Sequence, residues 1–122
     1  MALPDDFRWG ATASSVSTDG VAPTADWSTW ERDGLAPRSG AGGGFTSDYA
    51  DDLKLAAQIG LTDIRVTVEW ARVEPRPGVV DSGVVDHYRE VLGAAREARL
   101  APWITLHHTS LPGWFAEDER GF

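Results

Sequence analysis

The sequence predicts an α/β fold in which parallel strands alternate with helices. Residues 62–70 alternate apolar and polar side chains with a period of two, which is typical of a strand. On either side of this segment, residues 47–60 and 82–98 carry apolar side chains at helical spacing, and residues 102–108 form another apolar run. This order of elements predicts parallel strand–helix units joined by right-handed crossovers.

The amino-terminal third of the chain contributes a strand and a long loop. Residues 7–13 are predicted to form a short strand that leads into a segment rich in serine and threonine. Residues 20–46 are rich in glycine, proline and serine, and are predicted to form a long loop. A loop of this length is expected to be functional or partly disordered. Trp27 and Trp30 lie within it and indicate that part of it packs.

The first predicted helix has signals at both ends. Ser47 is a suitable N-cap, and Asp48, Asp51 and Asp52 follow it in the first turn. Acidic side chains are favoured there because the amino end of a helix carries a partial positive charge. Gly60 suits the carboxyl-terminal cap, so the helix is expected to end beside it.

The second predicted helix runs over residues 82–98, with Asp81 or Ser82 as its cap. Prolines and a glycine at 75–78 mark a turn before it. The third predicted strand, over 102–108, ends in two histidines. The tail over 111–122 is mixed in character and is predicted to have no closing element.

The middle strand carries different chemistry on its two faces. The apolar set is Ile64, Val66 and Val68, and the polar set is Arg65, Thr67 and Glu69. A strand buried on both faces of an open sheet would be apolar throughout. In a barrel, the apolar face of a strand packs against helices and the polar face points into the lumen near the mouth of the active site. A half-solvated strand at a sheet edge gives the same pattern, and the pattern alone favours neither.

Composition narrows the class of partners. The chain has 122 residues, which suits one domain or a piece of a larger one, and a net charge of −8. The excess of acids disfavours nucleic acids and anionic membranes as partners, and no apolar run is long enough to span a bilayer. The start of the chain lacks the basic and apolar character of a signal peptide, so a cytoplasmic location is expected. The chain has no cysteine, which excludes disulfides and thiolate chemistry.

No metal or cofactor site is predicted. His107 and His108 are consecutive in a predicted strand, so their imidazoles should point to opposite faces and cannot share one metal ion. His87 has no acidic or histidine partner four residues further along its helix. The glycine-rich run at 40–44 lacks the lysine of a phosphate-binding loop and does not directly follow a strand.

Two basic residues are candidates for ligand contact. His108 ends a predicted parallel strand, where α/β folds place ligand-binding residues. The alternative for His108, and the more frequent situation, is a histidine bonded to a neighbouring loop. Arg65 lies on the polar face of the middle strand, and a cation there needs an anionic partner. Glu69 is four strand residues away, roughly 13 Å, so the partner must come from elsewhere.

Five motifs in order resemble the beginning of glycoside hydrolase family 1, the β-glucosidase and β-glycosidase family. They are FRWG at 7–10 followed by Gly20, DWSTWE at 26–31, SDYADDLKLAAQIG at 47–60, IRVTVEWARVEP at 64–75 and TLHHTSLPGWF at 105–115. The resemblance covers nearly all of the chain but only about the first third of a family member. It implies a partial TIM (β/α)₈ barrel with about the first three parallel strands and the first two helices, in a single segment spanning residues 1–122.

The resemblance also implies roles for individual residues. His108 matches the family histidine that hydrogen-bonds a sugar hydroxyl in the cleavage subsite, and Arg65 matches the arginine that orients the nucleophilic carboxylate. Ser17 stands where the family usually has a sugar-binding glutamine, and a short hydroxyl cannot reproduce the donor and acceptor of an amide. Further departures are Asp19 in place of a glutamate and Thr109 in place of an aromatic residue. The family's structural W-x-R pair corresponds to Trp70 and Arg72, and Glu69 is often serine in relatives.

The implied activity is hydrolysis of O-glycosidic bonds by a retaining mechanism that uses two carboxylates. The family carries these glutamates in an Asn-Glu-Pro and a Glu-Asn-Gly motif, and neither occurs in this chain. We therefore expect an amino-terminal fragment that lacks both catalytic glutamates, is inactive alone, and has a β-glycoside or small sugar as ligand. The alternative is a non-catalytic sugar-binding or assembly module that pairs with a second copy or a companion chain through open sheet edges.

Overall fold

The computed structural model describes residues 3–118, in which three strands and six helices alternate. The elements are β1 (Gly10–Ala13), α1 (Ser15–Thr18), α2 (Asp26–Arg32), α3 (Phe45–Gln58), β2 (Asp63–Thr67), α4 (Trp70–Val73), α5 (Ser82–Glu97), β3 (Ala101–Thr105) and α6 (Gly113–Asp118). None of the helices in this part of the chain has the length and apolar character needed to cross a membrane.

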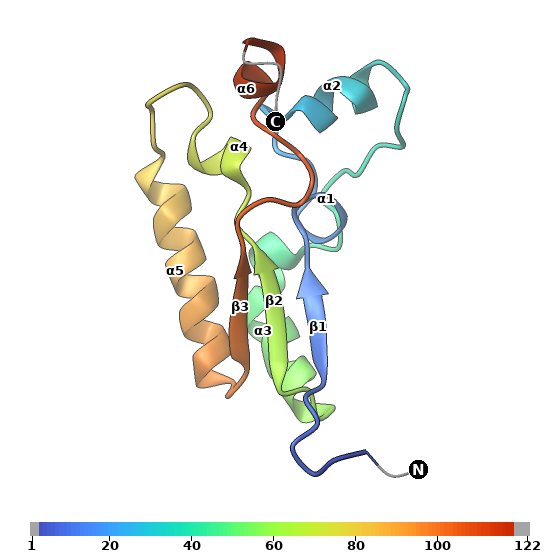
Figure 1. The fold of residues 1–122 in the computed structure, drawn as a ribbon, viewed down its shortest axis with the longest axis vertical. Coiled ribbons are helices and arrows are strands. Elements are labelled where there is room, and N and C mark those ends of the chain that lie inside the picture. The colour runs from blue at the N-terminus through green and yellow to red at the C-terminus, as the bar shows by residue number, and fades with distance from the viewer. Residues whose placement is uncertain (1–2, 119–122) are drawn as a thin grey trace.

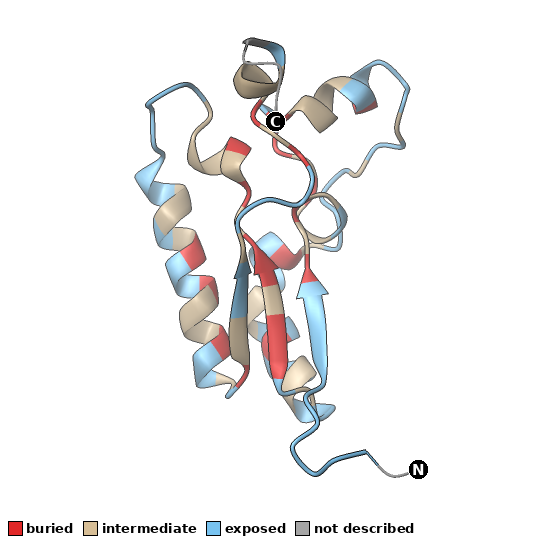
Figure 2. Ribbon diagram, viewed as in Figure 1, coloured by how far each residue is buried: buried red, intermediate tan, exposed pale blue. Residues whose placement is uncertain are grey.

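The three strands form one parallel sheet with β2 in the middle, as the sequence predicts (Figure 1). In the register of this sheet, Arg65 on β2 lies opposite Thr12 on β1 and Trp103 on β3. Among the described residues, β1 and β3 each pair only with β2. Figure 2 shows the consequence, because β2 is the most buried strand while β1 is mostly exposed.

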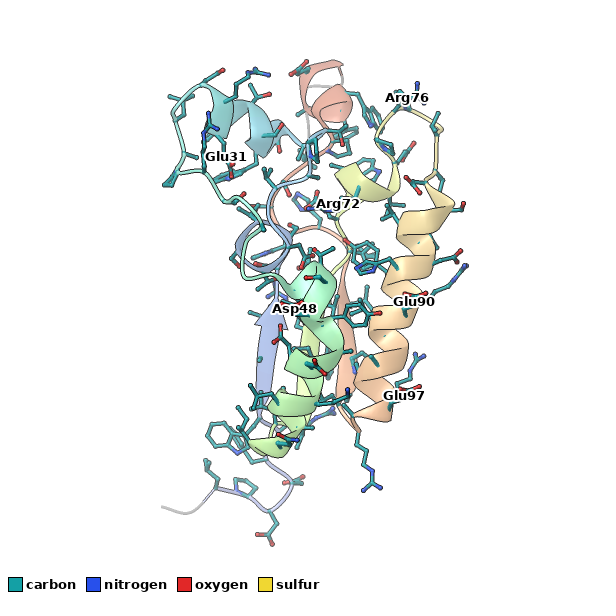
Figure 3. All side chains as sticks on the ribbon, turned by 180° about the vertical axis from the view of Figure 1, so that it is seen from behind. Glu31, Asp48, Arg72, Arg76, Glu90 and Glu97 are labelled. Atoms are coloured by element: carbon teal, nitrogen blue, oxygen red, sulfur yellow. The ribbon has the colours of Figure 1, made fainter. Side chains whose placement is uncertain are left out.

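Helices α3 and α5 cover the same face of the sheet, as the two opposite views show (Figures 1 and 3). The core between them is a single apolar cluster whose buried members are Ala13, Phe45, Leu53, Ile64, Val66, Tyr88, Val91, Ala95 and Leu100. Ile64 and Val66 therefore point toward the helices. Because side chains alternate along a strand, Asp63, Arg65 and Thr67 belong to the opposite face, which we call the inner face of the sheet.

The helix ends agree with the sequence in part. Helix α3 begins at Phe45 with Gly44 as its N-cap, so the prediction of Ser47 as N-cap is wrong. Gly44 has a positive φ of 82°, which lets the chain turn into the helix three residues earlier than predicted. The predicted end at Gly60 is confirmed, since this residue adopts a φ of 94° just past the helix. The predicted cap of α5 is also confirmed, because the Asp81 carboxylate accepts the amide of Val84 at 3.1 Å.

Two segments predicted as irregular contain helices. The predicted long loop over 20–46 includes α2, in which Trp27 and Trp30 stack with ring centroids 5.6 Å apart. These residues are three apart, a spacing that brings side chains together on a helix. The mixed tail over 111–122 contains α6, and its last four residues lie outside the described part of the chain.

The strands are shorter than predicted. Strand β1 begins at Gly10 instead of residue 7, and β3 ends at Thr105, so both histidines lie in the loop after it. Strand β2 ends at Thr67 because Glu69 caps the short helix α4, which begins at Trp70. A period-two pattern therefore continues in the sequence beyond the residues that pair in the sheet.

Candidate functional site

The loops and short helices that follow the strands gather at one end of the sheet. Figure 1 shows α1, α2, α4 and α6 at the carboxyl ends of the strands, whereas the chain's amino terminus lies at the other end. Ligand-binding residues of parallel α/β folds come from this carboxyl edge. The predicted site residues can therefore be located against it.

Two of the three predicted site residues line one cavity. Ser17 lies on α1, just after β1, and His108 lies in the loop after β3. Together with Ser14, Trp27 and Thr109 they line a cavity of about 130 Å³. The hydroxyl oxygens of Ser14 and Ser17 are hydrogen-bonded to each other. Val16 also lines the cavity, so its surface combines apolar area from Val16 and Trp27 with the hydroxyls of the serines and the imidazole of His108. Such a mixture suits contact with a molecule that carries both hydroxyl groups and apolar faces.

Arg65 lies apart from this cavity, in the middle of β2. Its side chain belongs to the inner face of the sheet and is half-buried. Its Nε atom is buried and has no hydrogen-bond partner among residues 3–118. Among the described residues the Glu69 side chain bonds to Ala71 and Ser110 and not to Arg65.

Glu69 has a different place from the one predicted. Because β2 ends at Thr67, Glu69 does not continue the polar face of the strand, and that prediction is wrong. Its side chain is buried, accepts the amide of Ala71 at 3.4 Å and accepts the hydroxyl of Ser110 at 2.8 Å. The residue thus connects α4 to the loop that carries His108.

Hydrogen bonds join the segment before α2 to the loop after β3, although the two are far apart in the sequence. The amide of Asp26 donates to the carbonyl of Leu111 at 2.9 Å, and the amide of Leu111 donates to the Asp26 carboxylate at 2.9 Å. The amide of Gly113 donates to the carbonyl of Thr24 at 2.7 Å. These bonds hold the loop after β3 against the segment that leads into α2. No spacing pattern in the sequence signals this contact, because its partners are 85 residues apart.

Arg72 and Gly20 shape the start of the long segment after α1. The Arg72 guanidinium reaches from α4 and donates to the carbonyls of Asp19 and Gly20 at 3.3 and 2.8 Å (Figure 3). Gly20 has a φ of 75°, and a Cβ on it would lie 2.2 Å from the carbonyl oxygen of Gly40. Only glycine fits here, which explains why this loop needs it.

A second cavity, of about 350 Å³, lies beside this bond network and is lined in part by Asp19, Arg72, His87 and Tyr88. Burial raises the pKa of the Asp19 carboxyl above its ordinary value. Burial also raises the pKa of Tyr88 to about 12. The hydroxyl of Tyr88 accepts the backbone amide of Glu69 at 2.9 Å, so it holds the start of α4.

The two neighbouring histidines face different surroundings. His107 lines an apolar cavity of about 380 Å³ with Val68, Trp70, Val73 and Leu106, whereas His108 lines the cavity with Ser17. Within residues 3–118, no three histidine or acidic side chains come together as a metal-binding group.

Comparison with known proteins places these features in a family. The model of glycosyl hydrolase family 1 matches residues 1–122. The chain belongs to glycosyl hydrolase family 1. The β-glycosidase BGL167 is 34% identical, with a TM-score of 0.84 over 93% of this chain and 28% of its own. A β-glycosidase from Pyrococcus horikoshii is 29% identical, with a TM-score of 0.86 over 98% of this chain and 28% of its own.

A relative of known sequence is the 6-phospho-β-galactosidase of Staphylococcus epidermidis, 27% identical over 95% of this chain and 26% of its own length. The chain thus spans little more than a quarter of the length of the family 1 proteins that it matches. The structural likeness confirms the prediction of a partial α/β barrel, with β1, β2 and β3 as neighbouring parallel strands.

Proposed function

We propose that this family 1 chain forms part of the sugar-binding site of a hydrolase that cleaves β-glycosides. The observation that carries the proposal is the cavity shared by Ser17 and His108, since it joins the loops after β1 and β3 at the carboxyl edge of the sheet. Membership of the glycosyl hydrolase family supports the same function. The ligand is a β-glycoside or a small sugar.

His108 and the two serines supply the polar contacts. The imidazole of His108 donates or accepts one hydrogen bond to a sugar hydroxyl. The paired hydroxyls of Ser14 and Ser17 together offer a donor and an acceptor on two separate atoms, as an amide side chain does. A single serine hydroxyl cannot reproduce this arrangement. Trp27 contributes an aromatic wall of the cavity.

Arg65 is proposed to orient a carboxylate. A guanidinium nitrogen that is buried without a partner is costly unless an acceptor reaches it. A nucleophilic carboxylate at the carboxyl side of the sheet would supply that acceptor, and the hydrogen bond from Arg65 would fix its orientation. Arg65 would then act on the nucleophile, while Ser17 and His108 contact the sugar.

The cleavage itself needs groups that this chain does not contain. Retaining hydrolysis uses two carboxyl groups about 5 to 5.5 Å apart, one as acid/base and one as nucleophile. The 122 residues include no asparagine, so neither the Asn-Glu-Pro nor the Glu-Asn-Gly motif is among them. We propose that these residues are inactive alone and act together with a segment that carries both glutamates.

A sugar titration tests the proposed site. Glucose or cellobiose, added to high millimolar concentration, should shift the imidazole resonances of His108 in the purified chain. His108→Ala should abolish binding, whereas His87→Ala, a matched change on α5, should leave it unchanged. The chain alone should not hydrolyse an aryl β-glucoside. Turnover that survives repurification would contradict the proposed division of roles, and unchanged spectra at saturating sugar would contradict the sugar site.

Assembly through the sheet edges is the second candidate function. Strands β1 and β3 each pair on one side only within the described sheet, and Trp103 and Ile104 on β3 are 56% and 52% exposed. Unpaired strands with exposed apolar side chains favour pairing with another chain. Light scattering should then give a mass above 13.2 kDa that falls on dilution, and a monomer at all concentrations would argue against self-association.

A further inference from the structure

We propose that Glu69 is a positioning residue for His108, because its buried carboxylate fixes the loop after β3 through Ser110. The inference rests on the proposed function in so far as His108 contacts sugar. It adds a role for a residue that lines neither the cavity of Ser17 and His108 nor the edge of the sheet.

The burial of Glu69 is the first step of the argument. Its side chain is 2% exposed, and no lysine or arginine within residues 3–118 forms an ion pair with it. Burying a carboxylate without a cation costs free energy, which hydrogen bonds must offset. Capping α4 does not by itself require this cost, since serine, threonine or aspartate also cap helices well. What the longer glutamate adds is the contact with Ser110 at 2.8 Å.

The backbone of Glu69 is held in place by hydrogen bonds at and next to this residue. Its backbone amide donates to the hydroxyl of Tyr88, which belongs to the apolar core on α5. Just before it, the amide of Val68 donates to the carbonyl of Thr105 at 2.9 Å and so continues the contact between β2 and β3. The carboxylate therefore projects from a fixed point in the core toward the loop after β3.

The loop itself has little packing of its own. Residues 106–109, which include His108, are all exposed, whereas Ser110 is 5% exposed. Ser110 is tied to Glu69 and Leu111 is tied to Asp26, so the two bonds anchor the loop to two different elements. Because exposed residues gain few contacts, these two anchors contribute strongly to where the imidazole of His108 lies.

Glu69→Asp is the variant that isolates the contact. Aspartate keeps the negative charge and caps helices well, so the variant should fold. It is one methylene shorter, so it cannot reach Ser110. The partner change is Ser110→Ala, and Glu97→Asp at the exposed far end of α5 is the matched control (Figure 3). The readouts are the His108 imidazole resonances without sugar and the dissociation constant for glucose.

We expect Glu69→Asp and Ser110→Ala each to displace the His108 resonances. Each should also weaken glucose binding by up to about tenfold, because a loosened loop must be ordered when the sugar binds. The double variant should be no weaker than Ser110→Ala, because both changes remove the same contact. The control Glu97→Asp should match the wild-type chain in both measurements.

Unchanged His108 resonances in Glu69→Asp, or effects that add in the double variant, would overturn the inference. The two proposals fail separately. If the wild-type chain binds no sugar, the proposed function is wrong, and the resonances of His108 measured without sugar still decide the role of Glu69.

Discussion

On the inner face of β2, the polar side chain at the amino end is fully hydrogen-bonded, whereas those toward the carboxyl end have buried atoms without partners. At the amino end, the Asp63 carboxylate accepts hydrogen bonds from the Arg8 guanidinium, from Thr62 and from the indole of Trp103. Toward the carboxyl end, Nε of Arg65 and Oγ1 of Thr67 are buried without a partner among residues 3–118. The strand is five residues long, so this change occurs within a short distance.

This difference corresponds to the two roles that the ends of a barrel strand usually have. In barrels the amino ends of the strands serve stability and the carboxyl ends carry the site. Asp63 fits the first role, because its hydrogen bonds connect the amino-terminal segment, β2 and β3. The role proposed for Arg65 fits the second, because its Nε has no partner among residues 3–118 and can donate to a new one. The predictions below test whether stability resides in the core and at the amino end.

The largest expected effect comes from a matched pair of leucines. Leu53 on α3 is 1% exposed in the core, and Leu106 in the loop after β3 is 74% exposed. Leu53→Ala should lower the free energy of unfolding by about 2–5 kcal/mol, through lost burial and a cavity. Leu106→Ala should change it by less than about 0.5 kcal/mol. Urea unfolding measures both, and equal losses would mean that the carboxyl-end loops carry as much stability as the core.

The next effect compares neighbouring residues on opposite faces of β2. Val66→Thr places a hydroxyl in the apolar core and should cost about 1–3 kcal/mol. Thr67→Val removes a buried hydroxyl that has no partner, so stability should stay equal or rise by about 1 kcal/mol. Both changes exchange valine and threonine, which have nearly the same shape, but their expected effects on stability are opposite. A clear loss of stability in Thr67→Val would contradict the view that the inner face is unsatisfied toward its carboxyl end.

Sequence patterns predicted the parts of this fold that depend on local chemistry. The period-two run located β2, and the caps at Asp81 and Gly60 located helix ends, because each depends on neighbouring residues. The ends of the strands were predicted too long. Alternation continues to Trp70, but the chain leaves the sheet after Thr67, where Glu69 caps α4.

The candidate site was predictable residue by residue but not as an arrangement. The family resemblance singled out Ser17, Arg65 and His108, and the structure brings two of them to one cavity. The contacts that form this cavity join residues far apart in sequence, such as Asp26 with Leu111 and Glu69 with Ser110. Such pairs leave no periodic signal. The burial of Glu69 in particular depends on packing that a single sequence does not display.

A third prediction concerns the amino end and its dependence on pH. Hydrogen bonds from Arg8, Thr62 and Trp103 hold the pKa of the Asp63 carboxyl well below its ordinary value. A group whose pKa falls on folding stabilises the fold above its unfolded pKa of about 3.9, and this stabilisation is lost as the pH drops further. Wild type should therefore be more stable than Asp63→Asn at pH 7, with a gap that shrinks below about pH 4. Urea midpoints of the two proteins at pH 7 and below about pH 4 measure this difference in stability. A difference that does not change with pH would refute the stabilising role of the Asp63 carboxylate.

The smallest effect concerns the turn that leads into β3 at the same amino end. Arg99 follows α5 with a φ of 62°, and the amides of Arg99 and Leu100 close the helix end by bonding to Arg96 and Ala95 at 2.9 Å. Gly60 has the equivalent place after α3, with a φ of 94°. A side chain in this left-handed conformation costs about 1 kcal/mol, so Arg99→Gly should raise the unfolding free energy by about that amount.

The reverse change, Gly60→Ala, should lower the unfolding free energy by a similar amount, since open space surrounds the position and only backbone strain acts. Thermal unfolding of the two variants tests the pair. Were Arg99→Gly to destabilise the chain, the Arg99 side chain would contribute contacts that outweigh its strain. Side chains at both Asp63 and Arg99 would then stabilise the amino end, and its contrast with the carboxyl end would be sharper than Asp63 alone indicates.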